Sequence, residues 1–196
     1  MKYSTNIEEV TKMQSDYLGF IFYEKSPRYF SGELPEIPLS VQKVGVFVDA
    51  TMNEILSKIK EDDLQLVQLH GNETAEFCEI LKIINISVIK AFSIDDSFDF
   101  QAITPYEGVC DYFLFDTKGK HPGGNGTTFN WKILENYPFQ KPFFLSGGSG
   151  LEEIKTIKQL NLPIHAIDVN SKFEIEPGLK NTQLLKQLQH ELSSKR

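Results

Sequence analysis

Two patterns of hydrophobic residues alternate along this chain. Short runs that are apolar at nearly every position predict strands buried on both faces, as in a parallel sheet. Between these runs, apolar residues recur at the three- and four-residue spacing of amphipathic helices. The predicted strands cover residues 17–22, 43–48, 64–69, 88–92, 112–115, 142–145 and 165–169, and the predicted helices cover 54–60, 74–84, 151–160 and 182–192.

The regular alternation of strand and helix predicts an α/β fold built from parallel βαβ units. Strands that recur at intervals of roughly 20–25 residues favour a (β/α)8 TIM barrel, as a single domain over residues 1–196. A doubly wound open sheet is the alternative, although no Gly-x-Gly-x-x-Gly fingerprint follows the first predicted strand. The links after Phe30 and after Ser93 are less regular, and we expect loops with short helices there.

The predicted strands are one short of a closed barrel. The segment before Tyr17 predicts a helix, because Thr5 and Glu8 have the spacing of a capping box and apolar residues follow at helical spacing. Tyr17 then begins the second strand of the barrel, and the first β-strand is missing from this chain. Seven parallel strands leave two free edges where a barrel has none. Either the sheet is open, or the barrel lacks its N-terminal strand.

The composition is that of an ordinary globular protein, with 40% hydrophobic and 24% charged residues. The net charge of −7 argues against a partner that is a nucleic acid or an anionic membrane. No apolar run is long enough for a transmembrane helix, and the first residues lack the apolar core of a signal peptide. We therefore expect a cytoplasmic protein. These features do not distinguish a monomer from a homodimer.

The two cysteines, Cys78 and Cys110, are too few and too far apart for a disulfide framework or a zinc site. Cys78 falls on the apolar face of a predicted helix, and Cys110 opens a strand at the end away from the polar residues described next. We expect both thiols to be structural and the protein to hold no metal.

Polar residues gather at and just after the carboxyl ends of the predicted strands, at the rim where α/β barrels bind their substrates. They are Arg28, His70, Asp116, Asp168, Asn170 and Ser171. Asp116 ends an apolar strand and precedes a glycine-rich loop at 123–126, which makes it a candidate catalytic carboxylate. His70 is either a general base or, as we favour, a hydrogen-bonded rim residue. Arg28 matches a carboxylate in geometry, and its alternative is a surface ion pair with Glu24.

The segment 146–150, with the sequence SGGSG, predicts an anion site. Gly147 and Gly148 allow backbone N–H groups to approach an anion, and the helix that follows adds a favourable dipole. The last two strand–helix loops of such barrels commonly hold a phosphate group. Because Asn170 and Ser171 follow the neighbouring strand, we favour a phosphate site over a tight turn that only leads into the helix.

Several motifs, in their order along the chain, resemble the phosphoribosylanthranilate isomerase family of tryptophan biosynthesis. They are 19–29 (GFIFYEKSPRY), 44–48 (VGVFV), 67–71 (VQLHG), 115–118 (FDTK) with 123–126 (GGNG) and 129–131 (FNW), 146–148 (SGG), and 168–171 (DVNS) with 177–178 (PG). The resemblance covers nearly the whole chain. It implies a cofactor-free (β/α)8 barrel that is an isomerase of aromatic amino-acid biosynthesis. The reaction is the Amadori rearrangement of N-(5-phosphoribosyl)anthranilate to 1-(2-carboxyphenylamino)-1-deoxyribulose 5-phosphate.

The resemblance also implies a role for each candidate residue. Asp116 is the general acid that protonates the furanose ring oxygen, and its apolar neighbours in the strand are expected to raise the pKa of this carboxyl by desolvation. Arg28 holds the anthranilate carboxylate. Asp168 and His70 match motif positions near the pocket. The substrate phosphate is held by Gly147, Gly148, Asn170 and Ser171.

The general base that the family uses has no counterpart in this sequence. In the family it is a cysteine at the end of strand one, within Lys-x-Cys-Gly-Met or Lys-x-Cys-Gly-Ile, and Met1 aligns with the residue after Cys-Gly. Neither Cys78 nor Cys110 follows a strand and can replace it. We therefore expect the full chain to begin several residues upstream, and the printed chain to be impaired. The alternative is a shortened, inactive barrel.

A second departure lies after the last strand, which reads Asn170-Ser171-Lys172 where the family usually has Ser-Ser-Gly. Asn and Ser can still donate hydrogen bonds to a phosphate group. Two other functions stay open on these residues. One is another phosphate-sugar barrel enzyme, such as an epimerase or an indole-forming lyase, which does not need Arg28 and Asp116 together. The other is a non-catalytic barrel that binds a phosphorylated ligand.

Overall fold

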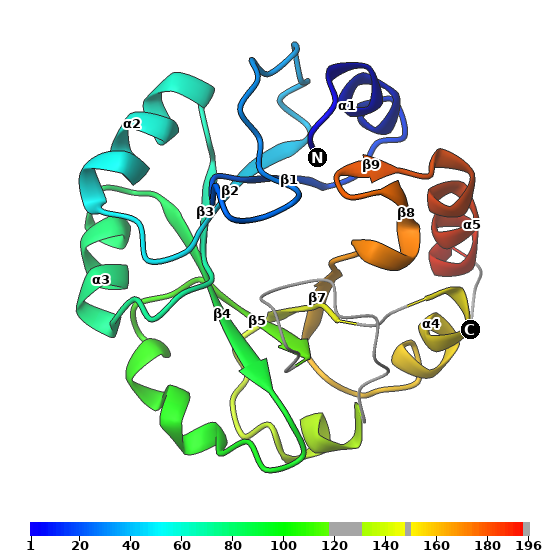
Figure 1. The fold of residues 1–196 in the computed structure, drawn as a ribbon. Coiled ribbons are helices and arrows are strands. Elements are labelled where there is room, and N and C mark those ends of the chain that lie inside the picture. The colour runs from blue at the N-terminus through cyan, green and yellow to red at the C-terminus, as the bar shows by residue number, and fades with distance from the viewer. Residues whose placement is uncertain (118–130, 148–149, 194–196) are drawn as a thin grey trace.

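A computed structural model describes residues 1–117, 131–147 and 150–193 of the chain. Parallel strands curl around a central axis, and helices surround them on the outside (Figure 1). The strands of this sheet are β1 (Tyr17–Ile21), β2 (Gln42–Phe47), β3 (Leu66–Leu69), β4 (Ser87–Ile94), β5 (Tyr112–Thr117), β6 (Phe143–Leu145) and β7 (Ile164–Ile167). The seven predicted strands and the α/β barrel fold are confirmed.

The other elements lie outside this sheet or at its rim. The α-helices are α1 (Ser4–Thr11), α2 (Met52–Asp62), α3 (Ala75–Ile83), α4 (Leu151–Ile157) and α5 (Thr182–Ser193). The 3-10 helices are η1 (Phe100–Tyr106), η2 (Trp131–Asn136) and η3 (Ser171–Phe173), and a small hairpin is formed by β8 (Glu174–Glu176) and β9 (Leu179–Lys180). Within the described residues, no helix is long and apolar enough to cross a membrane.

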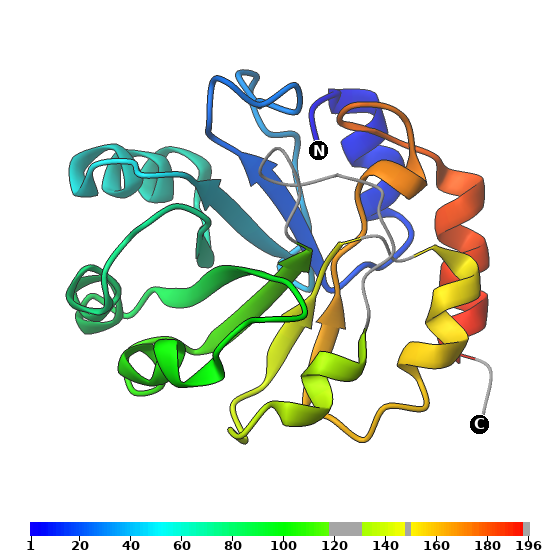
Figure 2. The ribbon, with the colours of Figure 1, turned by 60° about the horizontal axis from the view of Figure 1, so that its bottom comes forward.

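The strands of the main sheet follow one another in chain order, so that β1 and β7 are its two edges in the described part of the chain. We call the space between these edges the open seam. At its lower end, the Tyr17 hydroxyl and the His165 Nε2 are 2.6 Å apart, which connects β1 to β7. Higher up, the Met1 nitrogen donates to the Gly19 carbonyl oxygen at 2.7 Å, along the free edge of β1. Figure 2 shows α4 and α5 side by side on the β7 side of the seam.

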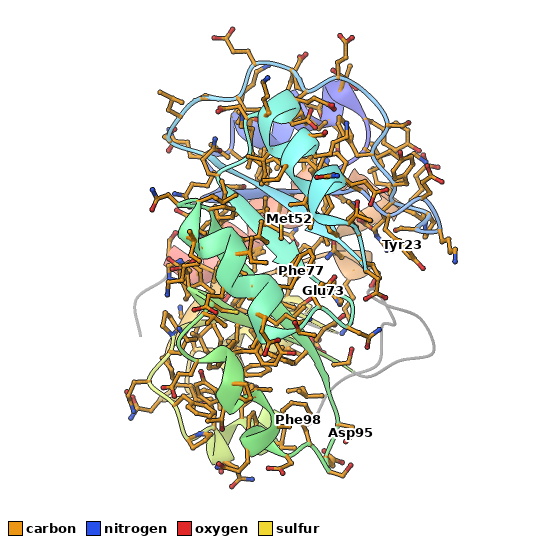
Figure 3. The ribbon with its side chains drawn as sticks, turned by 90° about the vertical axis from the view of Figure 1, so that its left-hand side faces the viewer. Tyr23, Met52, Glu73, Phe77, Asp95 and Phe98 are labelled. Carbon is orange, nitrogen blue, oxygen red and sulfur yellow. The ribbon has the colours of Figure 1, made fainter. Side chains whose placement is uncertain are left out.

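The predicted helices α2 and α3 begin at side-chain caps. Thr51 and Glu54 form a reciprocal capping box at the start of α2, and the Thr74 side chain accepts a hydrogen bond from the Phe77 backbone at the start of α3. These caps satisfy backbone N–H groups that a helix start otherwise leaves unpaired. Figure 3 views this outer side of the barrel, where α2 and α3 stand in front of their strands.

The predicted capping box at Thr5 and Glu8 is wrong. The N-cap of α1 is Tyr3, which makes no side-chain capping bond, and Thr5 already lies inside the helix. Tertiary contacts hold the start of α1 instead. Asn6 donates from its side chain to the Lys180 carbonyl at 3.0 Å and accepts from the Lys180 backbone N–H at 2.7 Å. The helix is thus anchored by β9, a partner far away in the sequence.

The two irregular links differ from each other. The link after Ser93 contains the 3-10 helix η1, as expected for a short helix in a loop. The link after Phe30 contains no helix, and residues 31–41 form turns, bends and irregular chain instead. The predicted helix over 151–160 ends early, at Ile157.

Apolar side chains form two layers, one on each side of the sheet. The outer layer packs between the strands and the helices, and both Cys78 and Cys110 are fully buried in it. The predicted core position of Cys78, on the apolar face of a helix, is thereby confirmed. The inner layer lies inside the barrel and consists of Val44, Leu66, Ile89, Ala91, Leu114 and Phe144. The inner layer leaves the carboxyl ends of the strands for polar residues.

Candidate active site

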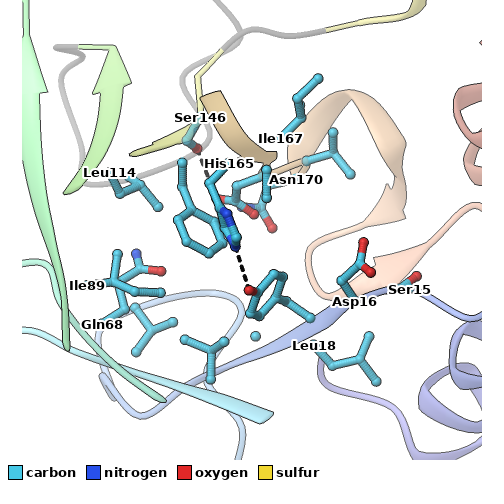
Figure 4. A pocket seen from close by; sticks show the side chains of 18 of the residues that line it. Ser15, Asp16, Leu18, Gln68, Ile89, Leu114, Ser146, His165, Ile167 and Asn170 are labelled. Carbon is cyan, nitrogen blue, oxygen red and sulfur yellow. Dashed lines mark hydrogen bonds between the residues drawn. The ribbon is translucent and has the colours of Figure 1, made fainter. Parts of the chain in front are cut away.

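A cavity of about 570 Å³ opens at the carboxyl ends of the strands and extends down the open seam. Figure 4 shows side chains of β1 and β7 on its opposite sides, with Gln68 and Leu114 on the inner wall. Five of the predicted site residues line it, namely Arg28, His70, Asp116, Asp168 and Asn170. The sequence motifs thus place these five residues around one cavity, as barrel geometry requires. Neither cysteine is among its lining residues in the described part of the chain.

Asp116 and His70 face each other across the inner wall of the cavity. Asp116 is the last-but-one residue of β5, and its side chain is 3% exposed. The His70 side chain, directly after β3, is 13% exposed, and its Nε2 lies 3.7 Å from Oδ2 of Asp116. Burial lowers the pKa of His70 below its ordinary value of 6.5, so that the imidazole is uncharged near neutral pH. A carboxyl group beside a neutral imidazole can exchange a proton with a substrate oxygen.

The Nδ1 atom of His70 is held by Gln68, a residue that sequence reasoning missed. The Gln68 amide nitrogen lies 3.0 Å from Nδ1. Gln68 is two residues before His70 on β3, and alternate residues of a strand point to the same face. A polar residue inside an otherwise apolar strand was the available signal.

Asp168 is the centre of a second polar cluster, on the β6 and β7 side of the cavity. The Ser146 hydroxyl donates to Oδ2 of Asp168 at 2.9 Å, and the Asn170 amide nitrogen lies 3.2 Å from the same oxygen. Asn170 Oδ1 in turn accepts from Lys180 Nζ at 2.9 Å. The Asp168 carboxylate is therefore oriented by two neighbours, and Asn170 is turned toward it.

Arg28 is paired with Glu174, so the alternative of a surface pair with Glu24 is wrong. Nη2 of Arg28 lies 2.7 Å from Oε2 of Glu174, and Nε lies 2.9 Å from the same oxygen. Burial opposes the ionisation of Glu174, but the hydrogen bond from Arg28 and the charge of Lys180 outweigh it and lower the pKa of this carboxyl. Both Glu174 and Lys180 escaped sequence reasoning, because they follow the last strand of the sheet in the small hairpin.

The residues predicted to hold a phosphate lie before α4 and at the start of η3. Gly147 has a φ of 86°, a left-handed conformation that favours glycine. Ser171 begins η3. Neither of them is among the described lining residues of the cavity. Gly148 and the glycine loop 123–126 lie outside the described residues.

Lys172, the residue that departs from the family pattern, lies against the start of α4. A Cβ added at Gly150 would be 3.1 Å from Cδ of Lys172, so the two loops are in contact. The Lys172 Nζ pairs with Oε1 of Glu153 at 3.1 Å, and Oε2 of Glu153 accepts from the Gly150 backbone at 2.8 Å. The lysine therefore adds a positive charge beside the predicted phosphate site. Over the described residues, no group of three or more His, Cys, Asp or Glu could hold a metal ion.

Comparisons with known proteins agree with this geometry. The profile of the N-(5′-phosphoribosyl)anthranilate (PRA) isomerase family matches residues 1–191. An N-(5′-phosphoribosyl)anthranilate isomerase of Parabacteroides distasonis is 44% identical over 193 residues, which cover 95% of this chain and 87% of the relative.

Solved structures of the same family have the same fold. The phosphoribosyl anthranilate isomerase from Thermus thermophilus has a TM-score of 0.83 and 26% identity, over 100% of this chain and 96% of that chain. A phosphoribosyl anthranilate isomerase in complex with reduced 1-(o-carboxyphenylamino)-1-deoxyribulose 5-phosphate has a TM-score of 0.80 and 29% identity, over 95% and 92% of the two chains. The chain described here belongs to the N-(5′-phosphoribosyl)anthranilate isomerase family.

Proposed function

We propose that this chain converts N-(5′-phosphoribosyl)anthranilate to 1-(2-carboxyphenylamino)-1-deoxyribulose 5-phosphate in the tryptophan pathway of the cytoplasm. The observation that carries the proposal is the buried Asp116 carboxyl beside an uncharged His70, in the same cavity as Arg28. The complex of a relative with a reduced form of this product supports it, because that ligand contains both a carboxylate and a phosphate.

Asp116 is assigned as the general acid. It gives its proton to the furanose ring oxygen while the bond from this oxygen to C1′ breaks, and the nitrogen lone pair of the substrate forms a C=N bond. Removal of the proton from C2′ then gives an enolamine, which becomes the ketone of the product. A buried carboxyl suits the first step, because proton transfer in a water-poor site avoids competition from solvent.

Arg28 is assigned to the anthranilate carboxylate. Its guanidinium presents more N–H groups than Glu174 uses, and the pair with Glu174 fixes its orientation. Gly147, Gly148, Asn170 and Ser171 are assigned to the phosphate group, and Asp168 and His70 to the sugar. The removal of the C2′ proton is not assigned to Cys78 or Cys110, because both are buried in the outer layer.

The substitution Asp116→Asn tests the proposal. It removes the acidic proton with little change in shape, so kcat is expected to fall by about 10²–10⁴-fold. Binding of the reduced product, measured by calorimetry, is expected to persist. The matched control is Asp96→Asn, at an exposed position after β4. Turnover that survives in Asp116→Asn contradicts the assignment. Ligand binding without turnover, even in a chain extended at Met1 by a strand ending in cysteine, supports a non-catalytic barrel instead.

A further inference from the structure

Gln68 is a buried amide among apolar side chains. It is 8% exposed on β3, and Figure 4 shows it beside Ile89 on the wall of the cavity. The inner layer on the same side of the sheet consists of apolar residues, among them Leu66 and Ile89. An amide in such surroundings costs free energy unless it is hydrogen-bonded. Its partner at 3.0 Å is Nδ1 of His70, so the interaction between the two side chains accounts for a polar residue at this position.

We propose that Gln68 is a positioning residue that fixes His70 in the neutral tautomer with its proton on Nε2. The Gln68 amide nitrogen donates to Nδ1, and a ring nitrogen that accepts a hydrogen bond cannot carry a proton. The single proton of an uncharged imidazole then belongs to Nε2. The tautomer of His70 follows from the geometry alone. The effect of this tautomer on catalysis rests on the proposed function.

The consequence is a hydrogen-bond donor that points into the cavity. The His70 Nε2 is buried, has no hydrogen-bond partner within the described residues, and lies 3.7 Å from Oδ2 of Asp116. With its proton there, His70 donates to an oxygen of the bound sugar while Asp116 protonates the ring oxygen. His70 thus acts as a neutral donor and cannot act as the base that removes a proton.

Charged groups around His70 favour different protonation states of the ring. Asp116 faces Nε2, and the negative charges of Asp168 and Glu73 favour the protonated ring. Burial and the positive charge of Lys90 disfavour it. Burial is the largest of these effects and keeps the pKa of His70 below its ordinary value. The ring therefore stays uncharged, and the hydrogen bond from Gln68 decides which nitrogen carries the proton.

Nitrogen NMR of the full chain, labelled with ¹⁵N-histidine, measures this tautomer directly. The His70 signals are assigned by comparison with His70→Asn. In the unmodified chain at neutral pH, we expect Nε2 to be protonated and Nδ1 to be unprotonated. In Gln68→Glu, the carboxylate accepts a hydrogen bond from Nδ1–H, so the proton is expected to move to Nδ1 and the pKa of the ring to rise. Gln68→Met keeps the length of the side chain without the hydrogen bond, and both tautomers are expected.

The matched control is Gln187→Glu, at an exposed position on α5, which is expected to leave the His70 signals unchanged. A proton on Nδ1 in the unmodified chain, or the same tautomer in Gln68→Glu, overturns the proposal. Turnover gives a second readout. Loss of one hydrogen bond made in the transition state costs about 10²-fold in kcat, so Gln68→Glu should lower kcat and leave KM near its original value. Absence of turnover even in a chain extended at Met1 by a strand ending in cysteine contradicts the proposed function, while the NMR result still decides the tautomer.

Discussion

The substitution Lys90→Met is expected to destabilise the fold strongly, because Lys90 carries a buried charge on the outer face of β4. Its side chain is 3% exposed, and its ammonium group pairs with Oε2 of Glu73 at 3.1 Å. The same group donates to the carbonyl oxygens of Gly71 at 2.8 Å, Leu69 at 3.2 Å and Ala91 at 3.3 Å. Methionine has a similar length and provides none of these hydrogen bonds.

The magnitude follows from what the substitution leaves behind. Among the described residues, Glu73, also 3% exposed, then keeps hydrogen bonds from the backbone N–H groups of Asp49 and Gly71 alone. A buried carboxylate without its counter-ion costs about 3–5 kcal/mol. For a chain of this size, each kcal/mol lowers Tm by roughly 2–4 °C. Lys90→Met is therefore expected to lower the free energy of unfolding by about 3–5 kcal/mol.

Urea denaturation followed by circular dichroism measures this loss. The control Lys60→Met replaces an exposed lysine on α2 and should change the free energy of unfolding by less than about 0.5 kcal/mol. The double variant Lys90→Met with Glu73→Gln removes both charges while an amide oxygen still accepts from Asp49, so it should recover a large part of the loss. A loss below about 1 kcal/mol in Lys90→Met, or no recovery in the double variant, refutes the reasoning.

Three further predictions concern the cavity. Arg28→Ala removes charge-assisted hydrogen bonds to the anthranilate carboxylate. The Kd for the reduced product, measured by calorimetry, should therefore rise by about 10–100-fold. An unchanged Kd rejects the assignment of Arg28 to this carboxylate. Burial lowers the pKa of His70 below 6.5, so the unfolded chain binds a proton there that the folded chain does not. The free energy of unfolding should therefore fall as the pH drops below about 6.5, and it should depend less steeply on pH in His70→Asn. The same pH dependence in both proteins contradicts the role given to His70. Extension of the chain at Met1 by a strand ending in cysteine should raise turnover by about 10²–10⁴-fold, and equal turnover argues against a thiol base at the open seam.

The strands were predictable because a parallel sheet covered on both faces needs runs of apolar residues. Helix starts were harder, because the same signature has two outcomes in this chain. Thr51 and Glu54 form a real capping box, whereas Thr5 and Glu8 have the same spacing and form none. The difference lies in Asn6, whose contacts with β9 fix the start of α1. No local pattern contains that information.

Some residues of the candidate site could likewise be predicted from the sequence, and others could not. Asp116 and His70 were predictable, because the carboxyl end of a buried strand is a place where polar residues have few structural reasons to be. Glu174 was not predictable as the partner of Arg28, because the two residues are 146 positions apart and no spacing rule connects them. The family resemblance indicated which residues matter, and the three-dimensional arrangement was needed to give their hydrogen-bond partners.

The two edges of the main sheet determine which parts of the protein should unfold locally first. β4 and β5 pair over six residues in the middle of the sheet, whereas β1 and β7 each pair with only one other strand of the sheet in the described residues. Amide hydrogens near the open seam should thus exchange with solvent sooner than those of β4 and β5. Asp116 stands on the slowly exchanging part, and Asp168 directly follows an edge strand. A ligand that spans both parts should slow exchange most strongly at the edges, which would make amide exchange a map of how the substrate lies.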